Sequence, residues 1–223
     1  KRALHRYLET GAVGALFRAD VCDEGAIEEL VVSVTHALGP IDILVINATP
    51  SQPQRALEDY EWADVQRMLD AFVKSPFLLS QKVGGPMKQR GWGRIIHIGS
   101  EVFDQGAPHF SAYVAAKWAA IGLAQTWAME LGPWNIRVNA LCPGSVGGER
   151  IDRVIERDAA ERGMTPDEIR RVYQRQSSLR DFVSPEDIAA MVCFLAGPGG
   201  RMISGQTLGI DGHTESLANW LGP

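Results

Sequence analysis

Tyr113 and Lys117 stand four residues apart in a segment whose composition predicts a helix. Residues at positions i and i+4 share one face of a helix, so the phenol and the ammonium are expected to lie one above the other. A neighbouring cation stabilises phenolate and lowers the pKa of tyrosine, which yields a proton donor and acceptor near neutral pH. Taken alone the pair is a weak signal, because most such pairs are solvated surface.

Ser100 strengthens this signal. It closes an apolar, strand-like run at residues 94–100, shortly before the tyrosine in the chain. Its hydroxyl can share a substrate oxygen with the phenol of Tyr113. A serine at a strand end, followed by the tyrosine and lysine on one helix, predicts a site that moves a proton to and from a small substrate.

Length and charge narrow the class of protein. The chain has 223 residues, 45% of them hydrophobic, which is enough for one sizeable core and predicts a single domain over residues 1–223. A net charge of −5 gives no support to a nucleic-acid or anionic-membrane partner. No apolar run has the length of a membrane-spanning helix, and no signal-peptide pattern opens the sequence.

Cysteines and histidines suggest neither disulfides nor metal. The three cysteines are widely spaced in apolar stretches, so they are expected to be reduced core residues of a cytoplasmic protein. The five histidines are scattered without the spacing of metal ligands, and no metal site is predicted.

Strand-like apolar runs alternate with helical segments along the chain. This order predicts a three-layer α/β fold, a doubly wound, Rossmann-like parallel sheet with helices on both faces. Strands are expected at residues 14–19, 41–46, 94–98, 135–141 and 206–211. Helices are expected at about 23–38, 58–89 (bent or broken near Pro76 and Gly84–Pro86), 113–131 and 185–195 (with Ser184 as N-cap). Residues 145–183 read as a polar lid insertion.

Three predicted strand ends carry residues with a possible role. Asn47, Ser100 and Pro143 each follow a strand. Ligands of open parallel sheets gather at the carboxyl ends of the strands. The three segments are therefore expected to meet at one crevice.

With these motifs the chain resembles the short-chain dehydrogenase/reductases over nearly all its length. The resemblance rests on the serine, tyrosine and lysine, on an Asn-Ala turn, on a Pro-Gly turn and on the last strand at 203–212. It implies reversible hydride transfer between NAD or NADP and a small alcohol or carbonyl substrate. It also implies a homotetramer or homodimer.

The same resemblance assigns roles to the residues. Tyr113 would exchange a proton with the substrate oxygen, Lys117 would lower its pKa and hold the nicotinamide ribose, and Ser100 would orient the carbonyl. The residues implied to bind the cofactor are Asp20, Val21, Asn47, Ala48, Thr49, Tyr113, Lys117, Pro143, Gly144, Ser145 and Val146.

The start of the sequence departs from the family. Members open with a strand, a Gly-x-x-x-Gly-x-Gly turn and a helix, whereas this sequence begins inside what resembles the second helix. The first two strands and the glycine turn are absent, which leaves the strand at 14–19 without a neighbour. We expect the sequence to be truncated at this end. The alternative is a rearranged, cofactor-free pseudoenzyme or binding protein.

Two further departures concern the site. Phe72 stands where the family often has an asparagine that serves a proton relay to the lysine. Thr49-Pro50 replaces the usual glycine after the Asn-Ala turn. Halohydrin dehalogenases, a non-redox branch of the fold, also lack the glycine turn, and they form the alternative function. They carry arginine where this chain has Lys117, which favours the oxidoreductase.

The substrate side is expected to come from residues 101–105, from His109 and Phe110, and from the lid. The lid carries eight arginines interleaved with eight carboxylates. Charges mixed at this density are typical of solvated helix faces, so they are not taken as an anion-binding site.

Overall fold

Four parallel strands form the sheet of this computed structural model, which describes residues 8–217. The strands are paired in the order β1-β2-β3-β4. Their bounds are β1 Ile43–Ile46, β2 Gly93–Ile98, β3 Ile136–Pro143 and β4 Thr207–Ile210. The expected α/β fold with a parallel sheet is confirmed.

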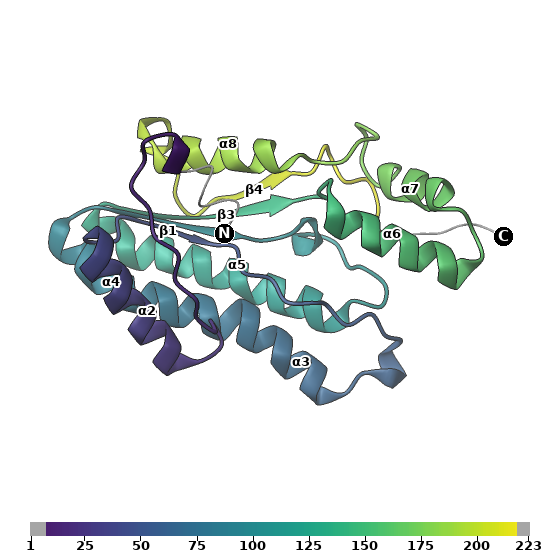
Figure 1. Ribbon diagram of the computed structural model, residues 1–223, viewed down its shortest axis with the longest axis horizontal. Helices are drawn as coiled ribbons and strands as arrows, with labels where there is room; N and C mark the ends of the chain where they lie inside the picture. Colours follow the sequence, from purple (N-terminus) through teal and green to yellow (C-terminus); the bar gives the residue numbers. More distant parts are fainter. Residues whose placement is uncertain (1–7, 218–223) are drawn as a thin grey trace.

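Helices cover both faces of this sheet (Figure 1). One layer holds α2 (Glu24–Leu38), α3 (Trp62–Leu69), α4 (Ser75–Arg90) and α5 (Ser111–Leu131). The opposite layer holds α8 (Pro185–Ala196). The expected lid folds as α6 (Glu149–Arg162) and α7 (Pro166–Gln174), which lie beyond the carboxyl ends of the strands.

Strands β2 and β3 are buried along almost their whole length because helices cover both of their faces. Toward α4 and α5, the core gathers Met87, Ile95 and Trp127. Toward α8, it gathers Ile96, Leu141 and Leu195. These two cores hold β2 and β3 in place, and so they also fix the positions of the residues that directly follow the strands.

The prediction of a strand at residues 14–19 is wrong. Residues 12–20 have no regular secondary structure, and β1 is the edge strand of the described sheet. No described strand offers these residues a hydrogen-bonded ladder, and their apolar side chains find no core. Val13 is 82% exposed and Leu16 is 62% exposed. The helix expected at the very start of the sequence falls largely on residues 1–7, outside the described part.

The long helical stretch at 58–89 is interrupted at one of the two places predicted from the sequence. A π-helical turn, Asp70–Lys74, separates α3 from α4 just before Pro76, which has no N–H to donate. The break expected near Pro86 is absent, since α4 continues through it to Arg90. Pro86 is exposed, so the carbonyl that loses its partner can face water. The expected N-cap of α8 is confirmed, because Ser184 and Asp187 form a capping box.

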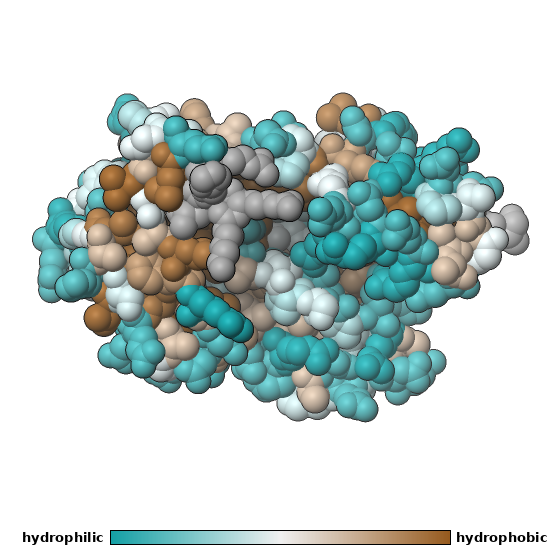
Figure 2. Space-filling view, in the orientation of Figure 1, coloured by the Kyte–Doolittle hydropathy of each residue, from teal (hydrophilic) through white to brown (hydrophobic). Residues whose placement is uncertain are grey.

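The surface is divided between apolar and polar regions. Figure 2 shows apolar side chains gathered over the end of the molecule where α2 and β1 lie, and polar side chains over α6 and α7. Val32, Leu38, Ile43 and Val45 are among the exposed apolar residues of α2 and β1. None of the helices within residues 8–217 is long and apolar enough to cross a membrane.

Gly144 fixes the turn after β3 against the end of β4. Its N–H donates to the carbonyl of Ile210 (3.0 Å). A Cβ at this position would lie 2.9 Å from Asp211 Cα and 3.2 Å from Asp211 O, and both of these are backbone atoms that cannot turn aside. The close approach therefore requires glycine.

Gly144→Ala is expected to lower the free energy of unfolding by roughly 1–3 kcal/mol, because the added methyl overpacks two backbone segments. Denaturant unfolding followed by circular dichroism measures this change. Gly147→Ala is the matched control, since a Cβ there would meet its nearest atoms at 3.7 Å, an ordinary contact. Equal stability of the two variants would contradict this account of the turn.

Candidate active site

A cavity of about 980 Å³ opens at the carboxyl ends of the strands, beneath the lid. Most of the residues implied to bind cofactor or substrate line it. These are Asn47, Thr49, Ser100, Tyr113, Lys117, Pro143, Gly144, Ser145 and Val146. Asp20, Val21 and Ala48 do not line it, and their role stays a prediction. The crevice expected from the strand ends is therefore present.

The pairing of β2 with β3 brings Ser100 and Pro143 together. Ile98 pairs with Leu141, and each strand then continues by two residues to reach these positions. The N–H of Gly99 donates to the carbonyl of Leu141, so the strands stay together beyond β2. A Cβ on Gly99 would lie 2.6 Å from Cys142 Sγ, which leaves no room for a larger residue before the serine.

Burial raises the pKa of the Tyr113 phenol above its ordinary value. A hydrogen bond with Ser100 and the charge of Arg150 act in the opposite direction, while Glu101 adds to the rise. The sequence predicts a pKa lowered by Lys117, and this expectation is not met in the structure, because desolvation of the phenolate outweighs the favourable charges. The hydrogen bond nevertheless places Ser100 and Tyr113 against each other, as a shared substrate oxygen requires.

Lys117 is a buried ammonium, 2% exposed. Its Nζ donates to the carbonyl of Ile98 (2.8 Å), which ties α5 to the last residue of β2. Burial lowers the pKa of Lys117 to about 7, and the charge of Arg150 contributes to this lowering. One N–H of the ammonium is thus used by the backbone, and the residue also lines the cavity.

Phe72 holds the other side of Lys117. The ammonium Nζ lies 4.1 Å from the centroid of the Phe72 ring, in a cation–π contact. The same ring meets Tyr113 edge-on, with centroids 5.5 Å apart and planes at 78°. The π-helical turn Asp70–Lys74 carries Phe72 into this position. The residue that replaces the relay asparagine therefore packs against both catalytic candidates.

Glu101 faces the cavity and is held by the segment that follows β4. Thr214 Oγ1 donates to Glu101 Oε2 (2.7 Å). Burial raises the pKa of Glu101 to about 7, despite this hydrogen bond. At mildly acidic pH the carboxyl group is therefore largely protonated, and the cavity contains an acid that can donate a hydrogen bond.

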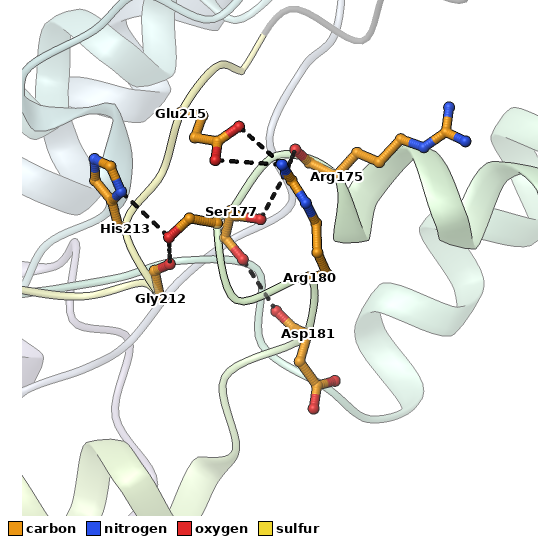
Figure 3. A network of polar contacts seen from close by, with 8 residues as sticks. Arg175, Ser177, Arg180, Asp181, Gly212, His213 and Glu215 are labelled. Atoms are coloured by element: carbon orange, nitrogen blue, oxygen red, sulfur yellow. Dashed lines mark hydrogen bonds and ion pairs between the residues drawn. The ribbon is translucent and has the colours of Figure 1, made fainter.

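The segment after β4 also anchors the lid. Figure 3 shows the loop after α7 bonded to this segment, with Arg180, His213 and Glu215 in the network. The N–H of Ser178 donates to the carbonyl of His213 (2.9 Å), and Arg180 pairs with Glu215 (3.2 Å). These bonds fix the end of the lid beside Thr214 and Glu101.

The lid closes the far side of the cavity through polar contacts of its own. Tyr173 of α7 lines the cavity, and its hydroxyl donates to the buried carboxylate of Asp158 (2.6 Å). Arg150 of α6 lines the cavity and donates to Gln52 Oε1 (2.8 Å) in the loop after β1. The lid is thus braced against the loop that carries Asn47 and Thr49.

Metal and disulfide chemistry find no support within residues 8–217. No group of three or more histidine, cysteine or acidic side chains in this part could hold a metal ion. All three cysteines are free thiols, and Cys142 is buried as expected. Cys193 is exposed and lines the cavity, so its assignment to the core is wrong.

Several known proteins are similar to this chain in sequence and in fold. The sequence family described as enoyl-(acyl carrier protein) reductase matches residues 1–213. A short-chain dehydrogenase/reductase from Armillaria gallica is 34% identical over 203 residues, covering 91% of this chain and 76% of the relative. The chain belongs to the short-chain dehydrogenase/reductase family.

Two other similar proteins are named for their reactions. D-beta-hydroxybutyrate dehydrogenase of Rhizobium meliloti (strain 1021) is 32% identical over 195 residues, covering 87% of this chain and 75% of the relative. The crystal structure of NAD⁺-bound xylitol dehydrogenase matches with a TM-score of 0.84 at 30% identity, covering 91% of this chain and 80% of that one. These names agree with the class of enzyme expected, a short-chain oxidoreductase.

Sequence reasoning missed part of the wall of this short-chain dehydrogenase/reductase. Gln52, Ile188, Val192 and Leu217 line the cavity but belong to no motif. They come from the loop after β1, from α8 and from the end of the described chain. Only the folded arrangement brings them together. Of the expected substrate-side residues, Glu101, Val102 and Phe110 line the cavity, and His109 does not.

Lys117 is expected to titrate near pH 7, and Phe72→Leu is expected to move this midpoint down by roughly one unit. Leucine keeps an apolar neighbour but removes the ring face that attracts the ammonium in a desolvated place. NMR of lysine side chains labelled at Cε measures the titration directly, and Phe72→Tyr, which keeps the ring, is the control. An unchanged midpoint in Phe72→Leu would contradict a role for the ring.

The same group gives stability a pH dependence. Between pH 7 and 10.5 the unfolded lysine binds a proton that the folded one has lost, so stability rises with pH across this window. Lys117→Met is expected to remove this contribution, as measured by denaturant unfolding at pH 7 and pH 9. A pH dependence that is the same in both proteins would contradict the burial of a titrating ammonium.

Proposed function

We propose that this chain transfers a hydride reversibly between a nicotinamide cofactor and a small alcohol or carbonyl substrate. The observation that carries the proposal is the meeting of Ser100, Tyr113 and Lys117 at one end of a single cavity, beside the turn at Pro143 and Gly144. Membership of the short-chain dehydrogenase/reductase family supports the same reaction.

The residues around Lys117 fit such a cofactor. The buried ammonium donates one N–H to the carbonyl of Ile98, and its other N–H groups can donate to the hydroxyls of a ribose. Asn47 lies on one side of the same cavity, and residues 143–146 lie on another. When bound, the nicotinamide supplies or accepts the hydride. The choice between NAD and NADP is left open in this proposal.

The side chains of the enzyme move and hold the proton. In the direction of reduction, the Tyr113 phenol donates its proton to the carbonyl oxygen; in oxidation, the phenolate accepts it from the alcohol. Ser100 donates a hydrogen bond to the same oxygen and so stabilises the charge that develops there. A charged Lys117 stabilises the phenolate. Because burial lowers the pKa of Lys117 to about 7, this stabilisation weakens as the pH rises and the ammonium loses its proton.

The quaternary structure is part of the proposal. We infer a homotetramer or homodimer, supported by apolar residues exposed on the outer faces of α4 and α5. Phe77 is 43% exposed, Trp118 is 50% exposed and Met129 is 81% exposed. Large apolar side chains at a surface are typical of subunit contacts. A cytoplasmic location stays a prediction from the cysteines.

Tyr113→Phe is expected to reduce turnover by about 10²-fold or more while leaving nicotinamide binding unchanged. Phenylalanine keeps the edge-on packing against Phe72 and loses only the hydroxyl. Fluorescence titration with NADH and with NADPH measures binding. Absorbance at 340 nm measures turnover of a panel of 3-hydroxy acids, their esters and simple secondary alcohols.

Tyr60→Phe is the matched control, because the Tyr60 hydroxyl donates to backbone carbonyls of Pro53 and His109 and does not line the cavity. It is expected to keep its turnover. Absence of nicotinamide binding by the unaltered protein would overturn the proposal. Release of halide from a halohydrin without any nicotinamide would instead establish the dehalogenase alternative.

A further inference from the structure

At least four of the eight arginines of the lid pair with carboxylates. Arg157 pairs with Asp158 (2.9 Å), Arg170 with Asp152 (2.6 Å) and Arg180 with Glu215 (3.2 Å). Arg153 lies 3.8 Å from Glu149 in an exposed pair. For these residues the expected solvated helix faces agree with the structure, and they carry no ligand site.

Arg150 differs from them in its surroundings. Its side chain lines the cavity and donates a hydrogen bond to the neutral amide oxygen of Gln52, at 2.8 Å. No carboxylate of residues 8–217 lies within 4.0 Å of its guanidinium. Arg150 also stands in the first turn of α6, where the helix dipole disfavours a cation. Local structure therefore gives no reason for a positive charge at this position.

The charge of Arg150 reaches the reacting end of the cavity. It lowers the pKa of the Tyr113 phenol and that of the Lys117 ammonium, so it acts on both. Two acids also face the cavity. Glu149 is paired with Arg153, and burial raises the pKa of Glu101 to about 7. At neutral pH and below, the cationic groups therefore outweigh the anionic ones, which favours an anion.

The rest of the wall is largely apolar. Val102, Ile151, Val154 and Leu217 line the cavity around these charges. Such a wall suits a short aliphatic chain.

We propose that Arg150 binds the carboxylate of the substrate, which makes the preferred substrate a short aliphatic hydroxy acid or keto acid. The inference deepens the proposed function and rests on it. The planar guanidinium can bind both carboxylate oxygens, with Gln52 holding it in place. Binding of the carboxylate to Arg150 on the lid then determines how far from the lid the reacting carbon lies when it meets Tyr113.

Binding of simple carboxylates tests this assignment without turnover. Isothermal titration calorimetry at pH 7 compares butyrate and hexanoate with their amides, with and without saturating NADH or NADPH. The unaltered protein is expected to bind the carboxylates about tenfold more tightly than the amides, and Arg150→Gln is expected to lose this preference. Arg175→Gln removes the same charge from an exposed side chain of the lid, outside the cavity, and is expected to keep it.

Three results would overturn the inference. One is that the unaltered protein binds carboxylates and amides equally, or binds neither. Another is a preference that survives in Arg150→Gln or is lost equally in Arg175→Gln. The third is weaker NADH or NADPH binding in Arg150→Gln with carboxylate binding unchanged, which would assign Arg150 to the cofactor phosphates. Failure of the unaltered protein to bind either dinucleotide is a separate result, and it counts against the proposed function itself.

Discussion

A buried ammonium joins the two halves of the site. Lys117 donates to the carbonyl of Ile98 and lies against the face of Phe72, so one side chain ties α5 to β2 and to the π-helical turn before α4. Burying a cation is costly unless partners surround it, and these two contacts are its compensation. The position of Tyr113, one turn before Lys117 on α5, follows from this constraint.

The rigid edge of the sheet and the lid contribute differently to the cavity. Ser100 and Pro143 are fixed by strands with cores on both faces, and Gly144 packs directly on the backbone of Asp211. The lid has a small apolar core between α6 and α7, and polar bonds such as those from Arg150 to Gln52 and from Tyr173 to Asp158 brace it further. In the proposed function, proton transfer belongs to the rigid side and the choice of substrate to the lid.

Local patterns predicted the parts of the fold that depend on neighbours in sequence. The Tyr113 and Lys117 pair, the strand ends and the cap at Ser184 are such features. Residues 14–19 have the apolar composition of a strand, but strand formation needs a paired neighbour, and the described sheet offers them none. Arg150 could not be told from the other lid arginines, because pairing across the fold decides which charges are neutralised. The pKa of Tyr113 was predicted in the wrong direction because burial does not appear in spacing.

The central claim is that one cavity holds a nicotinamide beside Tyr113. A crystal structure with NADH or NADPH and a short keto-acid analogue tests it most directly. The account predicts the nicotinamide ring between Tyr113 and the turn at Pro143 and Gly144, with its ribose at Lys117. A dinucleotide bound outside this cavity, or a ring turned away from Tyr113, would contradict it.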